Sequence, residues 1–206
     1  MTVDQVARTS PLASRAAQLQ ATPDGVRLEE VAFLTQLNLR LDPGGAALAA
    51  VEGVLQQSLR VTPGSVTRTG ERTLLWLGPD EWLLVAPPGE HAALLPALRA
   101  ALRDSGGVVV DVSAHRTTID VHGKLAREVL AKGCSLDLHP AVLTPDRCAE
   151  VLLARAPAIL VPHPDGQGVR LLVRSSFAGY VADWLLDATV EFGPVADRAD
   201  RPGDRP

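Results

Sequence analysis

The sequence predicts an α+β fold built from split β-α-β units of the ferredoxin-like kind, with mixed or antiparallel sheets. Short apolar runs typical of strands recur along the chain and alternate with segments whose apolar residues have helical spacing. Two pairs of neighbouring runs are separated by turn-forming residues, at 78–81 and 164–166, as in β-hairpins. The 206 residues are enough for one domain or two small fused ones. We therefore expect one α+β domain over residues 26–193, with two subdomains at about 26–106 and 107–193.

The first subdomain should contain three strands and two helices. Its elements, in chain order, are a strand at 31–41, a helix carrying Leu48, Val51, Leu55 and Leu59, a hairpin of strands at 73–77 and 82–86, and a helix at 89–104. Pro96 stands inside the second helix, where it removes a backbone donor. We therefore expect either a kink at this proline or a helix that begins close to Leu94.

The second subdomain should contain five strands and two helices. Residues 108–112 form an unbroken apolar run, which is typical of a strand buried on both faces. The elements that follow are a strand at 117–121, a helix carrying Leu125, Val129 and Leu130 and closed by Gly133, strands at 150–154, 158–161 and 169–173, of which the last two form a hairpin, and a last helix capped by Ser175 or Ser176. No clean sequence repeat links the two subdomains, so any duplication is one of topology.

Both ends of the chain differ from this pattern. Residues 1–25 mix polar and small residues with prolines and show only a hint of helix near 14–20, so we expect an N-terminal arm. Residues 194–206 alternate Asp, Arg, Pro and Gly without apolar periodicity, which predicts a disordered tail. The first 20 residues carry charges and no apolar core, unlike a secretory signal, so we expect a cytoplasmic protein.

Composition argues against several classes of function. A net charge of −4 with only 3% aromatic residues argues against a nucleic-acid partner. The apolar runs are broken by Arg or Pro well before the roughly 18 residues that a membrane span needs, so we expect no membrane partner either. Yet 46% of the residues are hydrophobic, and soluble monomers rarely expose large apolar patches. This composition suits a subunit that hides apolar surface in an interface.

A search for catalytic, cofactor-binding and metal-binding residues yields none. Asp111, Ser113 and His115 are the residue types of a nucleophilic triad, but residues so close in sequence cannot converge as base, nucleophile and orienter. The five histidines lack metal-ligand spacing, and His115 and His122 differ in strand parity and so face opposite sides. The two cysteines form no CxxC pair and are expected to be small buried residues, and the glycine-rich turns lack the rest of a phosphate-binding loop.

Charged residues at the ends of predicted strands are candidates for contact with a partner. Arg suits bidentate contacts with carboxylates, and Trp and Arg dominate binding hot spots. The candidate partner interface therefore consists of Arg40, Trp82, His115, Arg116 and Arg174. For each of them the alternative is a structural role, as a core tryptophan or a solvated charge.

Five longer segments follow one another in an order and spacing that point to a family. They are QLNLR at 36–40, LGPDEWLLV at 77–85, DVSAHRTTIDVHGKLAREVL at 111–130, GCSLDLHP at 133–140 and RSSFAGYVADWL at 174–185. Together with SPL at 10–12 they resemble the gamma subunit of heterotetrameric sarcosine oxidase over roughly residues 10–192. The shorter pattern Ile119-x-Val121-x-Gly123-x-x-Ala126-x-x-x-Leu130 is similar to the wider aminomethyltransferase superfamily.

This resemblance implies an aminomethyltransferase-like fold and the role of a non-catalytic structural or assembly subunit. The complex that it implies has alpha, beta, gamma and delta subunits. It oxidises the N-methyl group of sarcosine and gives glycine, a one-carbon unit for tetrahydrofolate, and hydrogen peroxide. The resemblance also implies that FAD, FMN, NAD, zinc and tetrahydrofolate are held by the other subunits, with no cofactor on this chain.

Two alternatives stay open at this point. One is a stand-alone folate-binding protein of the aminomethyltransferase superfamily, which would need a carboxylate to hold the pterin ring. Asp111 and Asp120 are the candidates for that carboxylate, although the chain looks short for the full folate-binding architecture. The other is the equivalent subunit of a related N-methylamine demethylase, which the sequence does not separate from sarcosine oxidase.

Overall fold

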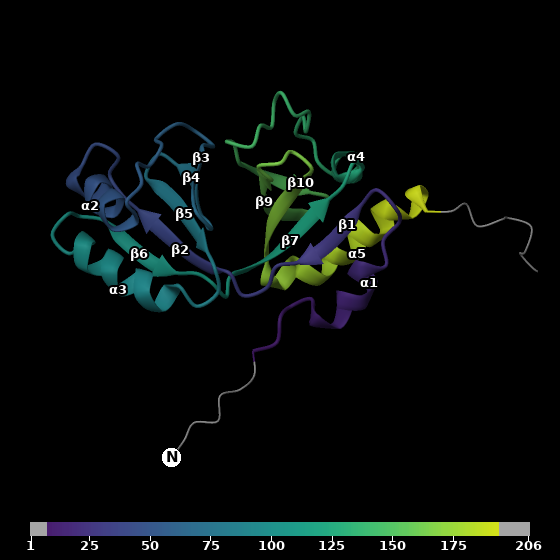
Figure 1. The fold of residues 1–206 in the computed structure, drawn as a ribbon, viewed down its shortest axis with the longest axis horizontal. Coiled ribbons are helices and arrows are strands. Elements are labelled where there is room, and N and C mark those ends of the chain that lie inside the picture. Colours follow the sequence, from purple (N-terminus) through teal and green to yellow (C-terminus); the bar gives the residue numbers. More distant parts are fainter. Residues whose placement is uncertain (1–7, 194–206) are drawn as a thin grey trace, which may run out of the picture.

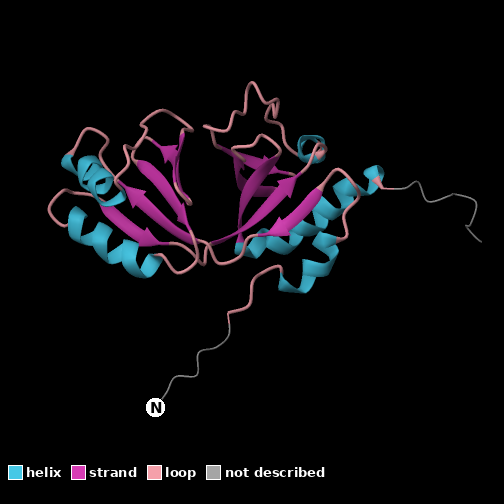
Figure 2. Ribbon diagram, viewed as in Figure 1, coloured by secondary structure: helices cyan, strands magenta, loops and turns pink. Residues whose placement is uncertain are grey.

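The computed structural model describes residues 8–193, which form two five-stranded sheets with helices on their outer sides (Figure 1 and Figure 2). Every pairing between its named strands is antiparallel. The predicted α+β class with antiparallel sheets is therefore confirmed. The predicted disordered tail, and residues 1–7 of the predicted arm, lie outside the described residues. None of the helices within 8–193 has the length and apolar character needed to cross a bilayer.

Sheet 1 has the strand order β3-β4-β5-β2-β6. Its strands are β2 (Thr35–Arg40), β3 (Val66–Thr69), β4 (Arg72–Gly78), β5 (Glu81–Ala86) and β6 (Val108–Asp111). Helices α2 (Ala46–Leu55) and α3 (His91–Leu102) cover one face of this sheet (Figure 1). Alternate residues of a strand share a face, so Leu37 and Leu39 of β2 pack with both helices in one core.

Sheet 2 has the strand order β1-β7-β10-β9-β8. Its strands are β1 (Arg27–Glu30), β7 (Arg116–His122), β8 (Ala149–Leu153), β9 (Ala156–Pro162) and β10 (Gly168–Arg174). The helices on its outer side are α1 (Ala16–Gln20), α4 (Ala126–Ala131) and α5 (Ala178–Thr189), and short 3₁₀ turns lie at Ala13–Arg15, Ser175–Phe177 and Val190–Phe192.

The two sheets follow the same plan. In sheet 1, β2-α2-β4-β5-α3-β6 is a ferredoxin-like unit with spatial order β4-β5-β2-β6, and β3 extends its edge. In sheet 2, β7-α4-β9-β10-α5 is the matching unit, β8 extends its edge, and β1 takes the place that β6 has in sheet 1. Each sheet therefore contains one strand from the other side of the boundary predicted near residue 106. Strand β1 pairs with β7 in sheet 2, and β6 pairs with β2 in sheet 1.

A third core fills the space between the inner faces of the two sheets. It contains Leu75, Leu83 and Val85 from sheet 1, and Ile159, Val161 and Leu172 from sheet 2. The outer faces of the sheets pack against their own helices in two separate cores. This inner core holds the two units together by burial of apolar side chains.

The sequence prediction misses the two short strands β1 and β3. Each has only four residues, so the alternation of apolar and polar residues is too short to recognise. The strand predicted at 31–41 is shorter than expected and begins at Thr35, because Phe33 just before it has a left-handed backbone with φ of 63°.

The prediction that residues 108–112 form a strand buried on both faces is wrong. Strand β6 lies at the edge of sheet 1, where only Val109 points into the core. Val108 and Val110 are 56% and 48% exposed. A run of three valines therefore marked a strand without revealing its place in the sheet.

The ends of three helices can be compared with the prediction. Helix α3 spans His91–Leu102 with Pro96 in its interior, so it lies within the predicted range 89–104 and the alternative of a start close to Leu94 is wrong. Gly133 follows α4 as predicted, but its φ is not positive, and it is needed for a different reason given below. Neither Ser175 nor Ser176 caps α5, whose N-cap residue is Phe177, and the Ser175 hydroxyl instead donates a hydrogen bond to the Ala114 carbonyl at 2.9 Å.

The part of the predicted N-terminal arm that the structure describes packs on sheet 2. Leu12 and Leu19 are fully buried in its outer core. Arg15 forms a bidentate ion pair with Asp183 of α5, with nitrogen–oxygen distances of 2.7 and 2.9 Å. This segment is therefore an integral part of the second unit.

Candidate functional site

Three of the predicted interface residues meet at one end of sheet 2. Arg116 of β7 and Arg174 of β10 are directly opposite each other in the antiparallel register. His115 precedes β7, and its carbonyl accepts a hydrogen bond from the Ser175 amide at 2.9 Å. Burial lowers the pKa of His115, and the positive charges of Arg116 and Arg174 lower it further. The end of the sheet is therefore a concentrated positive patch.

Arg40 lies on the other sheet but is connected to this patch through Glu81. Its guanidinium binds the carboxylates of Asp80 at 3.0 Å and Glu81 at 2.8 Å. Burial lowers the pKa of Arg116, whereas the charges of Glu150 and Glu81 act to raise it. Glu81 thus interacts electrostatically with arginines of both sheets.

A groove of about 380 Å³ lies beside the positive patch, on the inner face of sheet 2. Its polar walls are Arg116, Arg174 and Glu150, and its apolar lining includes Leu152, Ile159 and Leu172. Leu152, on the edge strand β8, is 61% exposed. Among residues 8–193, neither Arg116 nor Arg174 forms an ion pair with a carboxylate. We call this feature the arginine groove, and it can accept an apolar group together with a carboxylate.

Trp82 does not belong to this surface. It is 1% exposed, lies in the outer core of sheet 1, and donates its indole N–H to the Arg60 carbonyl at 3.1 Å. The inclusion of Trp82 among candidate partner contacts is therefore corrected, because a buried side chain cannot touch a partner. The indole ring of Trp82 therefore packs in the core of sheet 1.

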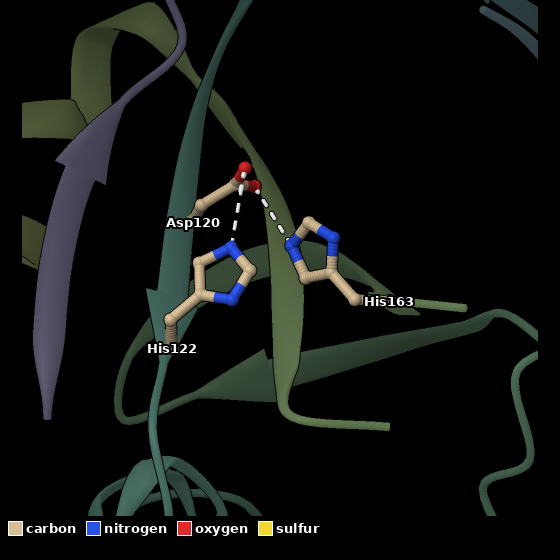
Figure 3. Close-up of side chains that lie close together, drawn as sticks. All are labelled: Asp120, His122 and His163. Carbon is tan, nitrogen blue, oxygen red and sulfur yellow. Dashed lines mark ion pairs between the residues drawn. The ribbon is translucent and has the colours of Figure 1, made fainter. Parts of the chain in front are cut away.

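A second polar site, at the other end of sheet 2, was missed in the sequence. Asp120 and His122 of β7 and His163 after β9 converge, with both histidines pointing Nε2 towards the carboxylate (Figure 3). The distances are 3.8 Å for His122 and 3.3 Å for His163, and the two rings lie 4.1 Å apart. Strand β10 runs between β7 and β9, so the histidines meet across it.

Gly168 makes this meeting possible. It is paired with His122 in the β10–β7 register, and a Cβ at this position would stand 2.8 Å from Nδ1 of that ring. The absence of a side chain on β10 therefore leaves room for the imidazole. Gly168 was recognised in the sequence as part of a hairpin. Only the pairing of β10 with β7 shows that it lies beside His122.

Asp120 is already strongly bound within the protein. Arg170 of β10 donates two hydrogen bonds to its carboxylate, both at 2.8 Å. Burial alone would raise the pKa of Asp120, but the hydrogen bonds and charge of Arg170, with a contribution from His163, lower it well below its ordinary value. Burial and the charge of His163 lower the pKa of His122.

Asp120, His122 and His163 are the residues of the described chain that could hold a metal ion, since their ligand atoms lie within 4.8 Å of one another. A divalent cation there would share the carboxylate with the Arg170 guanidinium, and the two positive charges would repel each other. The arrangement is better suited to a buried ion pair between sheet strands. The expectation that this chain carries no metal site remains a prediction.

The other sequence candidates have structural partners. The Ser113 hydroxyl donates to the Asp111 carboxylate and accepts from the backbone N–H of Gln36 at 3.0 Å, which fixes the turn between β6 and β7. Cys134 and Cys148 are free and buried, as predicted. Burial raises the pKa of the Cys148 thiol to about 11.

The paired ferredoxin-like units define the class of fold. The glycine cleavage system aminomethyltransferase T from Bartonella henselae matches with a TM-score of 0.66, over 87% of this chain and 57% of that chain, at 16% sequence identity. At this identity the likeness is one of fold, and it confirms the aminomethyltransferase-like architecture.

Closer relatives identify the family. The model of the sarcosine oxidase gamma subunit family matches residues 40–191. Sarcosine oxidase subunit gamma from Corynebacterium sp. (strain U-96) is 42% identical over 190 residues, which are 90% of this chain and 91% of the relative, and the Arthrobacter sp. subunit is 39% identical over 173 residues, 84% of each. A chain of heterotetrameric sarcosine oxidase from Corynebacterium sp. U-96, in complex with pyrrole 2-carboxylate, matches with a TM-score of 0.85 at 38% identity, over 92% of this chain and 98% of that chain. The chain belongs to the sarcosine oxidase gamma subunit family.

Proposed function

We propose that this chain is the non-catalytic structural subunit of a heterotetrameric sarcosine oxidase and that it works in the cytoplasm. Its partners are the alpha, beta and delta subunits, which carry FAD, FMN, NAD, zinc and tetrahydrofolate. The complex oxidises sarcosine to glycine, with transfer of a one-carbon unit to tetrahydrofolate and formation of hydrogen peroxide. Similarity to the gamma subunit over most of the length of both chains supports this proposal.

The arginine groove is the surface that we assign to a partner subunit. Its two arginines have no carboxylate partner among the described residues, and the exposed Leu152 stands beside them. Arg and buried apolar anchors provide much of the binding energy in protein interfaces. His115, Arg116 and Arg174 are thus the proposed contact residues, and Arg40 extends the same side through Glu81.

A non-catalytic role is supported by the way the polar side chains are used. Both oxygens of the Asp120 carboxylate are bound by Arg170, and one oxygen of the exposed Asp111 carboxylate is bound by Ser113. These were also the two candidates for holding a pterin ring in a stand-alone folate-binding protein. Because Asp120 is fully bound within the protein and Asp111 is an exposed residue of the edge strand β6, we do not propose folate binding by this chain.

The test is to produce the chain alone and together with the other three subunits. We expect the isolated chain to be colourless and to form no peroxide from sarcosine, and the co-produced complex to carry flavin absorbance and oxidise sarcosine. Sarcosine oxidation by the isolated chain would overturn the non-catalytic role. Failure of the folded chain to join the flavin-containing subunits would overturn the assignment to this complex.

A further inference from the structure

A second cavity, of about 170 Å³, lies between the two sheets and shares only Leu172 with the lining of the arginine groove. Sheet 1 lines it with Arg68, Thr73, Leu75 and Val85, and sheet 2 with Val161, Arg170 and Leu172. His163 and Pro164 of the β9–β10 turn complete the wall. The cavity thus has an apolar floor formed by the inner core and a polar wall that carries two guanidinium groups.

The charge of Arg68 is not balanced by an ion pair. Its guanidinium donates to two backbone carbonyls, those of Pro145 at 2.6 Å and Pro162 at 2.8 Å, and no carboxylate within the described chain forms an ion pair with it. Burial lowers the pKa of Arg68, and the neighbouring charge of Arg170 lowers it further. A partly buried cation with a second cation beside it is stabilised when an anion binds.

The arginine and carboxylate side chains around the cavity leave a single positive excess. Arg68 and Arg170 contribute two positive charges, and Asp120, bound to Arg170, contributes one negative charge. Asp146 acts on Arg68 from outside the cavity but is itself paired with Arg60 at 3.3 Å. The ligand that matches this wall therefore carries one negative charge, and a carboxylate suits the planar donors of arginine.

The volume of the cavity limits the size of the ligand. An apolar cavity of about 150 Å³ is enough to bind benzene, whereas sites for drug-sized ligands measure about 300–1,000 Å³. We propose that this cavity binds a small monocarboxylate whose apolar body is about the size of one aromatic ring, with the carboxylate on Arg68 and the body on Leu75, Val85 and Leu172. This site is too small for a folate, and both of its arginines differ from those of the arginine groove.

The site is tested on the full-length chain by isothermal titration with benzoate and, as an uncharged analogue, benzyl alcohol. We expect benzoate to bind at least about tenfold more tightly, and Arg68→Gln to reduce this difference to about threefold or less. Arg68→Lys, which keeps the charge, should retain most of the preference. Arg99→Gln on the exposed surface of α3 makes the same charge change outside the cavity and should have no effect.

Equal binding of the two compounds, no binding to the folded chain, or an unchanged preference in folded Arg68→Gln would overturn the proposal. If Arg68→Gln does not fold, the wild-type chain still decides the question by NMR. Nuclear Overhauser contacts from the benzoate ring to methyl groups of Leu75, Val85 and Val161, which do not line the arginine groove, support the site. Contacts confined to other methyl groups contradict it.

Discussion

The indole ring of Trp184, on α5, lies directly against Gly133 at the end of α4 and leaves no room for a Cβ at that position. The glycine is therefore required for close packing of the two helices on the outer side of sheet 2. A left-handed backbone is not the reason, since its φ is not positive. The contact joins two segments that are about fifty residues apart in the chain but adjacent in the same core.

Gly133→Ala should lower the free energy of unfolding by about 1–3 kcal/mol, because the added methyl group overpacks the contact with Trp184. Gly53→Ala is the matched control. Gly53 lies inside α2 with open space around it, so alanine there should raise the free energy of unfolding by about 0.5–1 kcal/mol. Urea denaturation of both variants measures the two effects. Equal and small changes would contradict the packing role of Gly133.

The Asp120–Arg170 pair predicts a specific loss of stability in acid. The pKa of Asp120 is lower in the folded chain than in the unfolded chain, where it is about 3.9. Its contribution is therefore complete above about pH 4 and is lost as the pH falls towards the folded-state pKa. Asp120→Asn should cost about 3 kcal/mol at pH 7, since it leaves Arg170 without its partner, and should reduce the loss of stability below pH 4.

Denaturation curves from pH 7 down to pH 3 test this expectation. Asp183→Asn removes the exposed ion pair with Arg15 and serves as the control, with little expected change at either pH. If Asp120→Asn and wild type lost stability in parallel as the pH fell, the pair would not be responsible for the acid sensitivity.

Trp82→Phe should reduce stability and leave partner binding unchanged. The substitution removes the indole hydrogen bond to the Arg60 carbonyl, a loss of about 1 kcal/mol, within a buried core. Thermal unfolding measures the stability, and co-purification with the other subunits measures the binding. Loss of partner binding at unchanged stability would restore Trp82 as an interface residue.

Much of the fold could be predicted from local patterns. The β4–β5 and β9–β10 hairpins follow from their turn residues, and α5 follows from its helical spacing. The exposure of β6 could not be predicted, because an apolar run marks a strand but not its position in a sheet. The pairing of β1 with β7 in sheet 2 could not be predicted either, because pairing between strands that are distant in the sequence leaves no local signal.

Some residues of the candidate sites could likewise be identified from the sequence, and others could not. Strand-end arginines 116 and 174 were identified from the sequence, and the β7–β10 register brings them together. Trp82 was misassigned because residue type does not reveal burial. The approach of His122 to His163 depends on β10 lying between their strands and on Gly168, and neither fact can be read from histidine spacing.

We propose above all that the chain binds the flavin-containing subunits through the arginine groove. The most direct test is affinity purification through this chain after co-production of all four subunits, with flavin absorbance measured in the eluate. Arg116→Glu/Arg174→Glu should reduce the flavin recovered per chain at least about tenfold, because it reverses both charges of the groove. Arg99→Glu, on the exposed surface of α3, should match wild type. Undiminished flavin recovery with the folded double variant would show that the arginine groove is not the surface that binds these subunits.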